Sequence, residues 1–173
     1  MKYTALLLIL ATACASAPPP SPAPAASGDD FQIQAALVAV YNVISGPAGR
    51  RDWNRFMPLF APGARLISTR IKDGAPVTTV MTPEEFSKSA QTYFAEHGFF
   101  EWPVNNRIER FRDVAQVWST YESRNASADD KPFARGINSF QLVRSGDRWL
   151  IMTIFWQEED AAHPIPPEYL PRR

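Results

Sequence analysis

Three charged residues in the second half of the chain, Glu122, Arg135 and Glu158, have the types and spacing of an acid–base site. A tight turn at Gly146-Asp147 would set Arg135 opposite Glu158 on neighbouring antiparallel strands. Closure of the polar loop 125–132 would likewise set Glu122 opposite Arg135. The sequence therefore predicts a row of carboxylate, guanidinium and carboxylate across neighbouring strands.

Such a row has two interpretations. An arginine between two carboxylates can hold one of them ionised as a base while the other keeps a proton as an acid, and the pair could then activate water. A cross-strand ion-pair ladder near the end of a sheet has the same composition, and we favour it because such rows are common on protein surfaces. A slip of one residue in either pairing would place the charges on opposite faces of the sheet.

A second group of residues has the composition of a ligand pocket. In the same pairing, polar and aromatic side chains alternate with the charged row and share the other face of the strands. With aromatic residues from the helices they would line a pocket suited to a small, largely apolar molecule. The candidate ligand-binding residues are Tyr41, Phe56, Phe60, Tyr93, Ser119, Tyr121, Asn138 and Gln157, with Phe155 beside them and Arg135 added from the charged row. The alternative is that these polar groups are hydrogen-bonded within a filled core. We assign no catalytic residue.

Three helices are predicted to position these residues. Apolar side chains recur at helical spacing after the capping pair Asp29-Asp30 and stop at Gly46-Pro47. A second, shorter helix is expected to begin after Asp52. The sequence Thr82-Pro83-Glu84-Glu85 is typical of a capping box with proline in the first helical position, and it begins a third helix that ends at Gly98.

The remaining segments have the pattern of strands. Asp73-Gly74 is a hairpin signal between two of them, and short connections join the last four, which favours antiparallel neighbours. The predicted strands are residues 64–71, 77–81, 100–111, 114–124, 133–144 and 149–158. The expected fold class is therefore α+β, with three helices packed on one face of a curved antiparallel sheet.

The N-terminus has the order of an export signal. In residues 1–13, Lys2 supplies a positive start and is followed by an apolar run, too short to span a bilayer, and by small residues before Cys14. We expect lipidation of Cys14, and the alternative is simple cleavage after Ala13. Residues 14–28 are rich in Pro, Ala and Ser and are expected to form a semi-rigid tether. The protein is thus predicted to be periplasmic or held at a membrane by a lipid.

After the export signal and the tether, the sequence predicts one domain at residues 29–159 and a proline-rich tail at 160–173. The chain has 18 basic and 18 acidic residues, so it lacks the positive field that nucleic acid or an anionic membrane surface requires, and a lipid is the one membrane contact we expect. Its single cysteine lies in the leader, and its two histidines are far apart in the sequence. We therefore expect no disulfide, metal site or cofactor in the domain.

Three stretches show a resemblance to a known superfamily. The segment RDWNRFMPLFAPGARLI and the later segments AQVWSTYES and RGINSFQLVRSGDRWLIMTIFWQ resemble the nuclear transport factor 2 (NTF2) superfamily, with its SnoaL-like and ketosteroid isomerase-like domains. The resemblance implies a cone-shaped, cystatin-like roll with a pocket between helices and sheet. Its members include isomerases, dehydratases, epoxide hydrolases and non-enzymatic binding or dimerisation modules, so fold alone does not assign an activity.

We accordingly expect an exported SnoaL-like domain of unassigned activity that binds a small, largely apolar molecule. One alternative is a hydrolase, isomerase or dehydratase that acts in the same pocket. Another is a non-catalytic dimerisation or interaction module. A homodimer is reasonable, because the apolar strand 150–156 could be covered on its second face by another copy.

Overall fold

The computed structural model describes residues 28–172, so the predicted export signal, Cys14 and most of the tether lie outside the described residues. Within this part of the chain the helices are α1 (Gly28–Ile44), α2 (Trp53–Phe56) and α3 (Pro83–Glu96), with the short 3-10 helices η1 (Met57–Leu59) and η2 (Pro167–Tyr169). The strands are β1 (Phe60–Lys72), β2 (Ala75–Met81), β3 (Phe100–Phe111), β4 (Val114–Arg124), β5 (Ala134–Ser145) and β6 (Arg148–Glu158).

The strands form one sheet in the order β2-β1-β6-β5-β4-β3. The predicted antiparallel meander of β3 to β6 is confirmed, as is the β1–β2 hairpin. The predicted antiparallel sheet has one exception, because β1 runs parallel to β6. No tight turn joins these two strands, so turn geometry does not impose an antiparallel direction on them. The sheet is therefore mixed, and the fold class is α+β as predicted.

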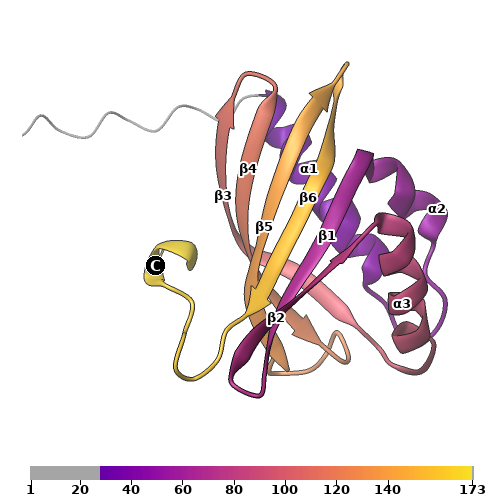
Figure 1. Cartoon of the computed structure of the whole chain (residues 1–173), viewed down its shortest axis with the longest axis vertical. Coiled ribbons are helices and arrows are strands. Elements are labelled where there is room, and N and C mark those ends of the chain that lie inside the picture. Colours follow the sequence, from indigo (N-terminus) through magenta and orange to yellow (C-terminus); the bar gives the residue numbers. More distant parts are fainter. Residues whose placement is uncertain (1–27, 173) are drawn as a thin grey trace, which may run out of the picture.

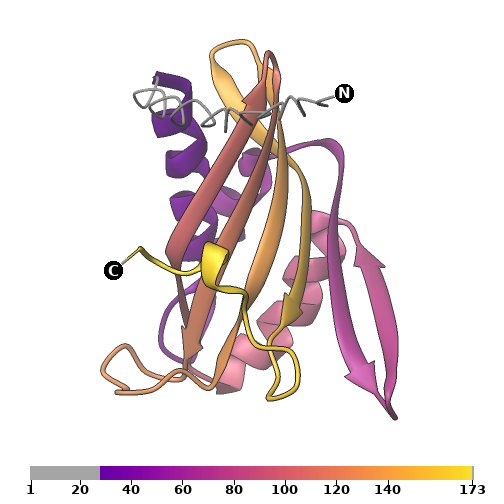
Figure 2. The same cartoon turned by 90° about the vertical axis from the view of Figure 1, so that its left-hand side faces the viewer.

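The helices α1, α2 and α3 lie on one side of the curved sheet (Figures 1 and 2). The long helix α1 packs against β3 and β6, and α3 packs against β1 and β2. The buried face of α1 follows the predicted helical spacing and consists of Ile33, Leu37, Val40, Tyr41, Val43 and Ile44. Burial of each large apolar side chain of this kind stabilises the fold by about 1.5–3 kcal/mol.

Local sequence signals account for the hairpin and for the start of α3. Asp73 and Gly74 both have positive φ, 52° and 79°, as a two-residue type I′ turn requires. Thr82 and Glu85 form the predicted capping box: the Glu85 amide donates to Thr82 Oγ1 (3.2 Å) and the Thr82 amide donates to Glu85 Oε2 (2.7 Å). The turn joins β1 to β2, which is an edge strand of the sheet, and the cap begins α3 directly after β2.

The strand β3 contains a bulge at Val104. Pro103 pairs with Tyr121, whereas Asn105 pairs with Thr120, so Val104 is an extra residue without a partner on β4. Because side chains alternate between faces along a strand, one extra residue exchanges the faces of all residues beyond it. Glu101 consequently pairs with Ser123 and lies on the helix side of the sheet.

A second bulge, at Met152, has the same effect on β6. Leu142 of β5 pairs with Ile151, whereas Gln141 pairs with Thr153. Beyond this point Trp156 and Glu158 lie on the helix side, where Phe155 and Gln157 had been expected. The predicted pairing of Arg135 with Glu158 is therefore wrong, and the pairing of Arg135 with Glu122 is confirmed.

The C-terminal segment crosses the face of the sheet opposite the helices (Figure 2). The carbonyl oxygen of Tyr169 accepts hydrogen bonds from Thr120 Oγ1 (2.7 Å) and Asn105 Nδ2 (3.0 Å). The Tyr169 ring contacts Trp118, with ring centroids 5.7 Å apart, and Ile165 is buried. The tail thus covers part of the outer face of β3 and β4.

None of the helices between residues 28 and 172 has the length and apolar character that crossing a bilayer requires.

Candidate functional site

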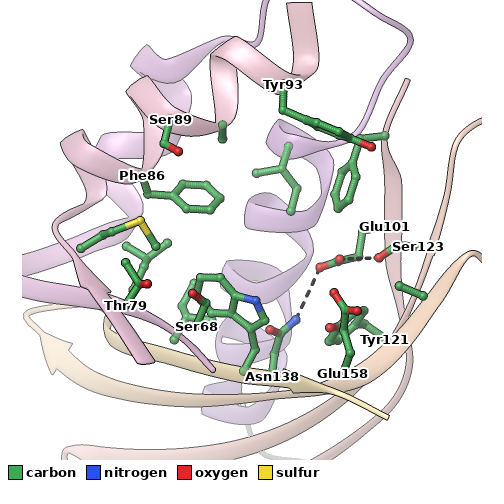
Figure 3. Close-up of a pocket in the computed structure, with 18 of the residues that line it drawn as sticks. Ser68, Thr79, Phe86, Ser89, Tyr93, Glu101, Tyr121, Ser123, Asn138 and Glu158 are labelled. Carbon is green, nitrogen blue, oxygen red and sulfur yellow. Dashed lines mark hydrogen bonds between the residues drawn. The ribbon is translucent and has the colours of Figure 1, made fainter. Parts of the chain in front are cut away.

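A cavity of about 930 Å³ lies between the helices and the inner face of the sheet. Aromatic and aliphatic side chains from the three α-helices and the strands form most of its wall, including Phe56, Phe86 and Trp156. Figure 3 shows Glu101, Tyr121 and Glu158 gathered on one side of this cavity, and Ser68 and Thr79 on the other. A large apolar space with a few convergent polar groups is the usual form of a small-molecule site.

Glu101 is the carboxylate of this site, and it is held in place through both its side chain and its backbone. The Ser123 hydroxyl donates to Glu101 Oε2 (2.6 Å), and Asn138 Nδ2 lies 3.5 Å from Oε1 (Figure 3). The Ser45 hydroxyl, at the end of α1, accepts a hydrogen bond from the Glu101 amide (2.9 Å) and donates to its carbonyl oxygen (3.0 Å). The first residues of β3 are therefore fixed against the helix layer.

Burial raises the pKa of Glu101 to about 7, because the charged form is poorly solvated. The hydrogen bonds from Ser123 and Asn138 oppose this rise, and the negative charge of Glu158 adds to it. Glu158 itself is exposed at the rim of the cavity. A carboxyl group that titrates near neutral pH can both accept and return a proton.

Tyr41 and Asn138 form a buried hydrogen-bond network behind Glu101. Asn138 Nδ2 donates to Tyr41 Oη (3.0 Å), and Tyr41 Oη is 2.7 Å from Ser119 Oγ. Burial, and then the charge of Glu101, raise the pKa of Tyr41 far above its usual value, so its hydroxyl remains neutral. This network holds the amide of Asn138 toward the carboxylate.

Tyr121 presents a second hydroxyl to the same space. Among the residues that the structure describes, none forms a hydrogen bond with the Tyr121 hydroxyl. Burial, followed by the charges of Glu101 and Glu158, raises its pKa, so the group stays protonated and can donate to a ligand. Its hydroxyl lies close to Gly136, where a Cβ atom would come within 2.6 Å of Tyr121 Oη and 2.4 Å of the Gln157 carbonyl oxygen. The glycine leaves the room that this position of Tyr121 needs.

The structure brings together five of the predicted pocket residues, which line the cavity: Tyr41, Phe56, Tyr93, Tyr121 and Asn138. Phe60 and Ser119 are buried in the adjoining core but are not part of the wall. The expected placement of Gln157 and Arg135 in the pocket is wrong, since both lie on the outer face together with Phe155. The bulge at Met152 accounts for Gln157 and Phe155, because it reverses the last residues of β6.

The predicted charged row exists in a changed form on the outer face. Arg135 contacts Glu122 Oε1 at 3.5 Å and Glu159 Oε1 at 3.0 Å, and Glu159 takes the position that was predicted for Glu158. The three side chains are partly exposed and lie outside the cavity wall. This arrangement is the cross-strand ion-pair ladder, which contributes little to stability.

Sequence reasoning missed Glu101 and Trp156, and it assigned Glu158 to the charged row instead of the cavity wall. Continuing the regular pairing from the turn at 112–113 along β3 places Glu101 opposite Arg124 on the outer face. Only the bulge brings it inside, and the sequence gives no clear sign of the bulge beyond the neighbouring Pro103. The charge of Glu101 between Phe100 and Trp102 was the one available signal of an unusual position.

Within residues 28–172 no group of three or more His, Cys, Asp or Glu side chains is arranged to hold a metal ion. Glu101 and Glu158 are the carboxylates of the cavity wall, and they face tyrosine, serine and asparagine groups there. The site therefore offers proton transfer and hydrogen bonding through its own side chains.

Comparison with solved structures identifies the fold. A protein of unknown function with a cystatin-like fold from Nostoc punctiforme superposes with a TM-score of 0.60 at 13% identity, covering 81% of this chain and 98% of that chain. An NTF2-like protein of unknown function from Silicibacter pomeroyi gives 0.52 at 13% identity, covering 75% and 94%. A proposed dehydratase of the NTF2-like family from Streptomyces avermitilis gives 0.56 at 14% identity, covering 77% and 97%.

The chain therefore has the NTF2-like fold, as its resemblance to that superfamily implied. No model of a known protein family matches the sequence, and no curated protein is similar to it in sequence.

Proposed function

We propose that this protein is an acid–base enzyme that binds a small, largely apolar molecule in the cavity and moves a proton on it. The observation that supports this most directly is Glu101, a carboxyl group in the wall of an apolar cavity whose pKa is raised to about 7. A base with a pKa near the working pH is the most effective proton carrier. Two neutral hydroxyl and amide donors, Tyr121 and Asn138, lie on the same side of the cavity.

The chemistry that fits is removal of a proton from a carbon next to a carbonyl group. The Glu101 carboxylate accepts that proton, and the Tyr121 hydroxyl donates a hydrogen bond to the oxygen on which negative charge develops. Return of the proton to another carbon completes an isomerisation. Alternatively, the bond from a neighbouring carbon to its hydroxyl breaks, and the hydroxyl takes the proton from Glu101 and leaves as water. This completes a dehydration, the reaction proposed for the NTF2-like protein of Streptomyces avermitilis.

Deuterium exchange tests this function without knowledge of the natural substrate. The apolar ketone 2-tetralone is incubated with the protein in D2O, and loss of its α-proton signals is followed by NMR. We expect the wild type to accelerate exchange over buffer and Glu101→Gln to lose at least about 100-fold of that acceleration. Glu96→Gln, which removes an exposed carboxylate of α3, serves as the control and should retain it. Equal rates for the wild type and Glu101→Gln would rule out Glu101 as the base.

Binding without turnover is the second candidate. It is favoured by the hydrogen bonds that Glu101 already accepts from Ser123 and Asn138, which satisfy the carboxylate within the protein. In that case 2-tetralone would bind, as detected by saturation-transfer NMR, while its exchange rate would stay at the buffer value.

We also propose that the protein is exported and anchored by a lipid on Cys14. The charged start, apolar run and small residues of positions 1–13 support this, together with the tether that follows. Expressed in a Gram-negative host, the wild-type chain should enter the detergent phase on Triton X-114 partitioning, and Cys14→Ser should move to the aqueous phase. A wild-type protein found wholly in the aqueous phase would contradict lipidation and favour simple cleavage after Ala13.

A further inference from the structure

Two basic side chains, Arg70 and Lys72, line the cavity from β1, near the edge of the sheet that β1 and β2 form. On β1 the residues Ser68, Arg70 and Lys72 alternate on the inner face, and all three contribute to the cavity wall. Thr79 and Val77 of β2 stand opposite Ser68 and Arg70 in the hairpin. The hairpin therefore extends the cavity outward as a wall with two positive charges.

Neither Arg70 nor Lys72 has a carboxylate partner within residues 28–172, where no ion pair of 4.0 Å or less involves them. Glu158 occupies the neighbouring inner position at the end of β6 without forming such a pair. The charge of Arg70 nevertheless acts on the interior, since it lowers the pKa of Tyr121 against the larger effect of burial. Its field thus reaches the polar side of the cavity.

The cations and Glu101 come from different parts of the sheet. Glu101 is on β3 and Arg70 on β1, with β6, β5 and β4 between these two strands. Between them the wall is aromatic, with Phe86 of α3 beside Trp156 of β6 (centroids 6.2 Å apart, Figure 3).

We propose that the natural ligand is amphipathic: an apolar ring system with a carbonyl or hydroxyl group at the Glu101 end and an anionic group, such as a carboxylate, at Arg70 and Lys72. This inference rests on the proposed function for the assignment of the Glu101 end. A guanidinium binds a carboxylate through paired hydrogen bonds, and an ammonium group adds a second positive charge. Two basic groups at the open end of an apolar cavity also attract an anion by long-range electrostatics.

The test uses two fluorescent probes of the same shape. 6-Hydroxy-2-naphthoate has a hydroxyl at one end and a carboxylate at the other, and 6-hydroxy-2-naphthamide replaces the carboxylate by a neutral amide. Dissociation constants are measured by fluorescence titration at neutral pH and low ionic strength for the wild type and for the double variant Arg70→Gln, Lys72→Gln. Arg65→Gln is the matched control, because Arg65 is on the same strand but donates to the carbonyl oxygens of Gly63 and Ala64.

We expect the wild type and Arg65→Gln to bind the naphthoate about fivefold more tightly than the amide, which is the effect of two partly solvated charge contacts. The double variant should bind both probes equally, with unchanged affinity for the amide. Equal binding of the two probes by the wild type, or a preference that survives in the double variant, would overturn the inference.

The probe titration and the deuterium-exchange experiment distinguish failure of the anion site from failure of the proposed function. A preference for the naphthoate that depends on Arg70 and Lys72, found together with no deuterium exchange on 2-tetralone, would support the anion site and reject the catalytic role of Glu101. Deuterium exchange that depends on Glu101, found together with no preference for the naphthoate, would support the catalytic role of Glu101 and overturn the anion site.

Discussion

At the scale of single residues, Glu101 has the largest consequence for behaviour in solution. Its carboxyl group is enclosed by protein, and burial raises its pKa from 4.5 to about 7. A group whose pKa is higher in the folded state than in the unfolded chain binds more protons in the folded state. Stability then decreases as the pH rises through the interval between the two values.

We therefore predict that the free energy of unfolding falls as the pH increases from 4.5 to about 7, by as much as about 3 kcal/mol from this group. Below that interval the group is protonated in both states and contributes no pH dependence. Urea unfolding at a series of pH values measures the effect. Glu101→Gln should remove this part of the slope, and Glu96→Gln, at an exposed position of α3, should not. Parallel curves for the wild type and Glu101→Gln would show that Glu101 is ionised in both states.

At the scale of elements, α3 depends on its first turn. The capping box of Thr82 and Glu85 satisfies backbone amides that have no partner within the helix. This helix forms one wall of the cavity through Phe86, Ala90 and Tyr93, so its start also sets the shape of the site.

We predict that Thr82→Ala lowers the free energy of unfolding by about 1 kcal/mol, because one amide loses its acceptor. Thr92→Ala is a suitable comparison, since Thr92 is an exposed residue of the same helix whose hydroxyl contacts only the Lys88 carbonyl oxygen. Chemical denaturation of the two variants should give a loss for the first and no loss for the second, because alanine has a higher helix propensity than threonine. An equal loss in both would mean that the cap makes no specific contribution to stability.

The helices and strands could be predicted from the sequence with small errors in their boundaries. The capping box, the Asp73-Gly74 turn and the alternation after Phe99 each depend on neighbouring residues, and the structure confirms all of them. Pairing derived from the tight turn at Gly146-Asp147 was correct as far as the bulge at Met152 on β6. Beyond it, the predicted inner and outer faces of β6 were exchanged.

The candidate site was predictable only in part for the same physical reason. Tyr41, Tyr93, Tyr121 and Asn138 lie on α1, α3, β4 and β5, whose facing residues follow from regular periodicity. Glu101 and Glu158 reach the cavity through bulges at Val104 and Met152. A bulge arises from the balance of packing across the whole sheet, and a local pattern does not reveal it.

At the scale of the whole molecule, the C-terminal segment bears on self-association. The expected homodimer would use the outer face of the sheet, and part of that face is covered by the tail through Tyr169 and Ile165. On β6, Phe155 remains 45% exposed. The surface open to a second copy is therefore smaller than the bare sheet would offer.

We predict that truncation after Glu159 increases self-association, because it uncovers Trp118 and Thr120 on the outer face. Sedimentation velocity over a range of concentrations, on the chain from residue 28 with and without residues 160–173, measures the change. Tyr169→Ala in the longer chain tests whether the ring contact with Trp118 holds the tail in place. A stable dimer of identical strength with and without the tail would show that the interface lies elsewhere.

The two bulges give this architecture a simple route to new chemistry. Each consists of one additional amino acid, and its presence decides whether a glutamate faces the interior or the solvent. In a gene, the gain or loss of a single codon in β3 or β6 would thus exchange the groups offered to a bound molecule while every codon for those groups stayed the same. Relatives of this chain could differ in reactivity through length alone.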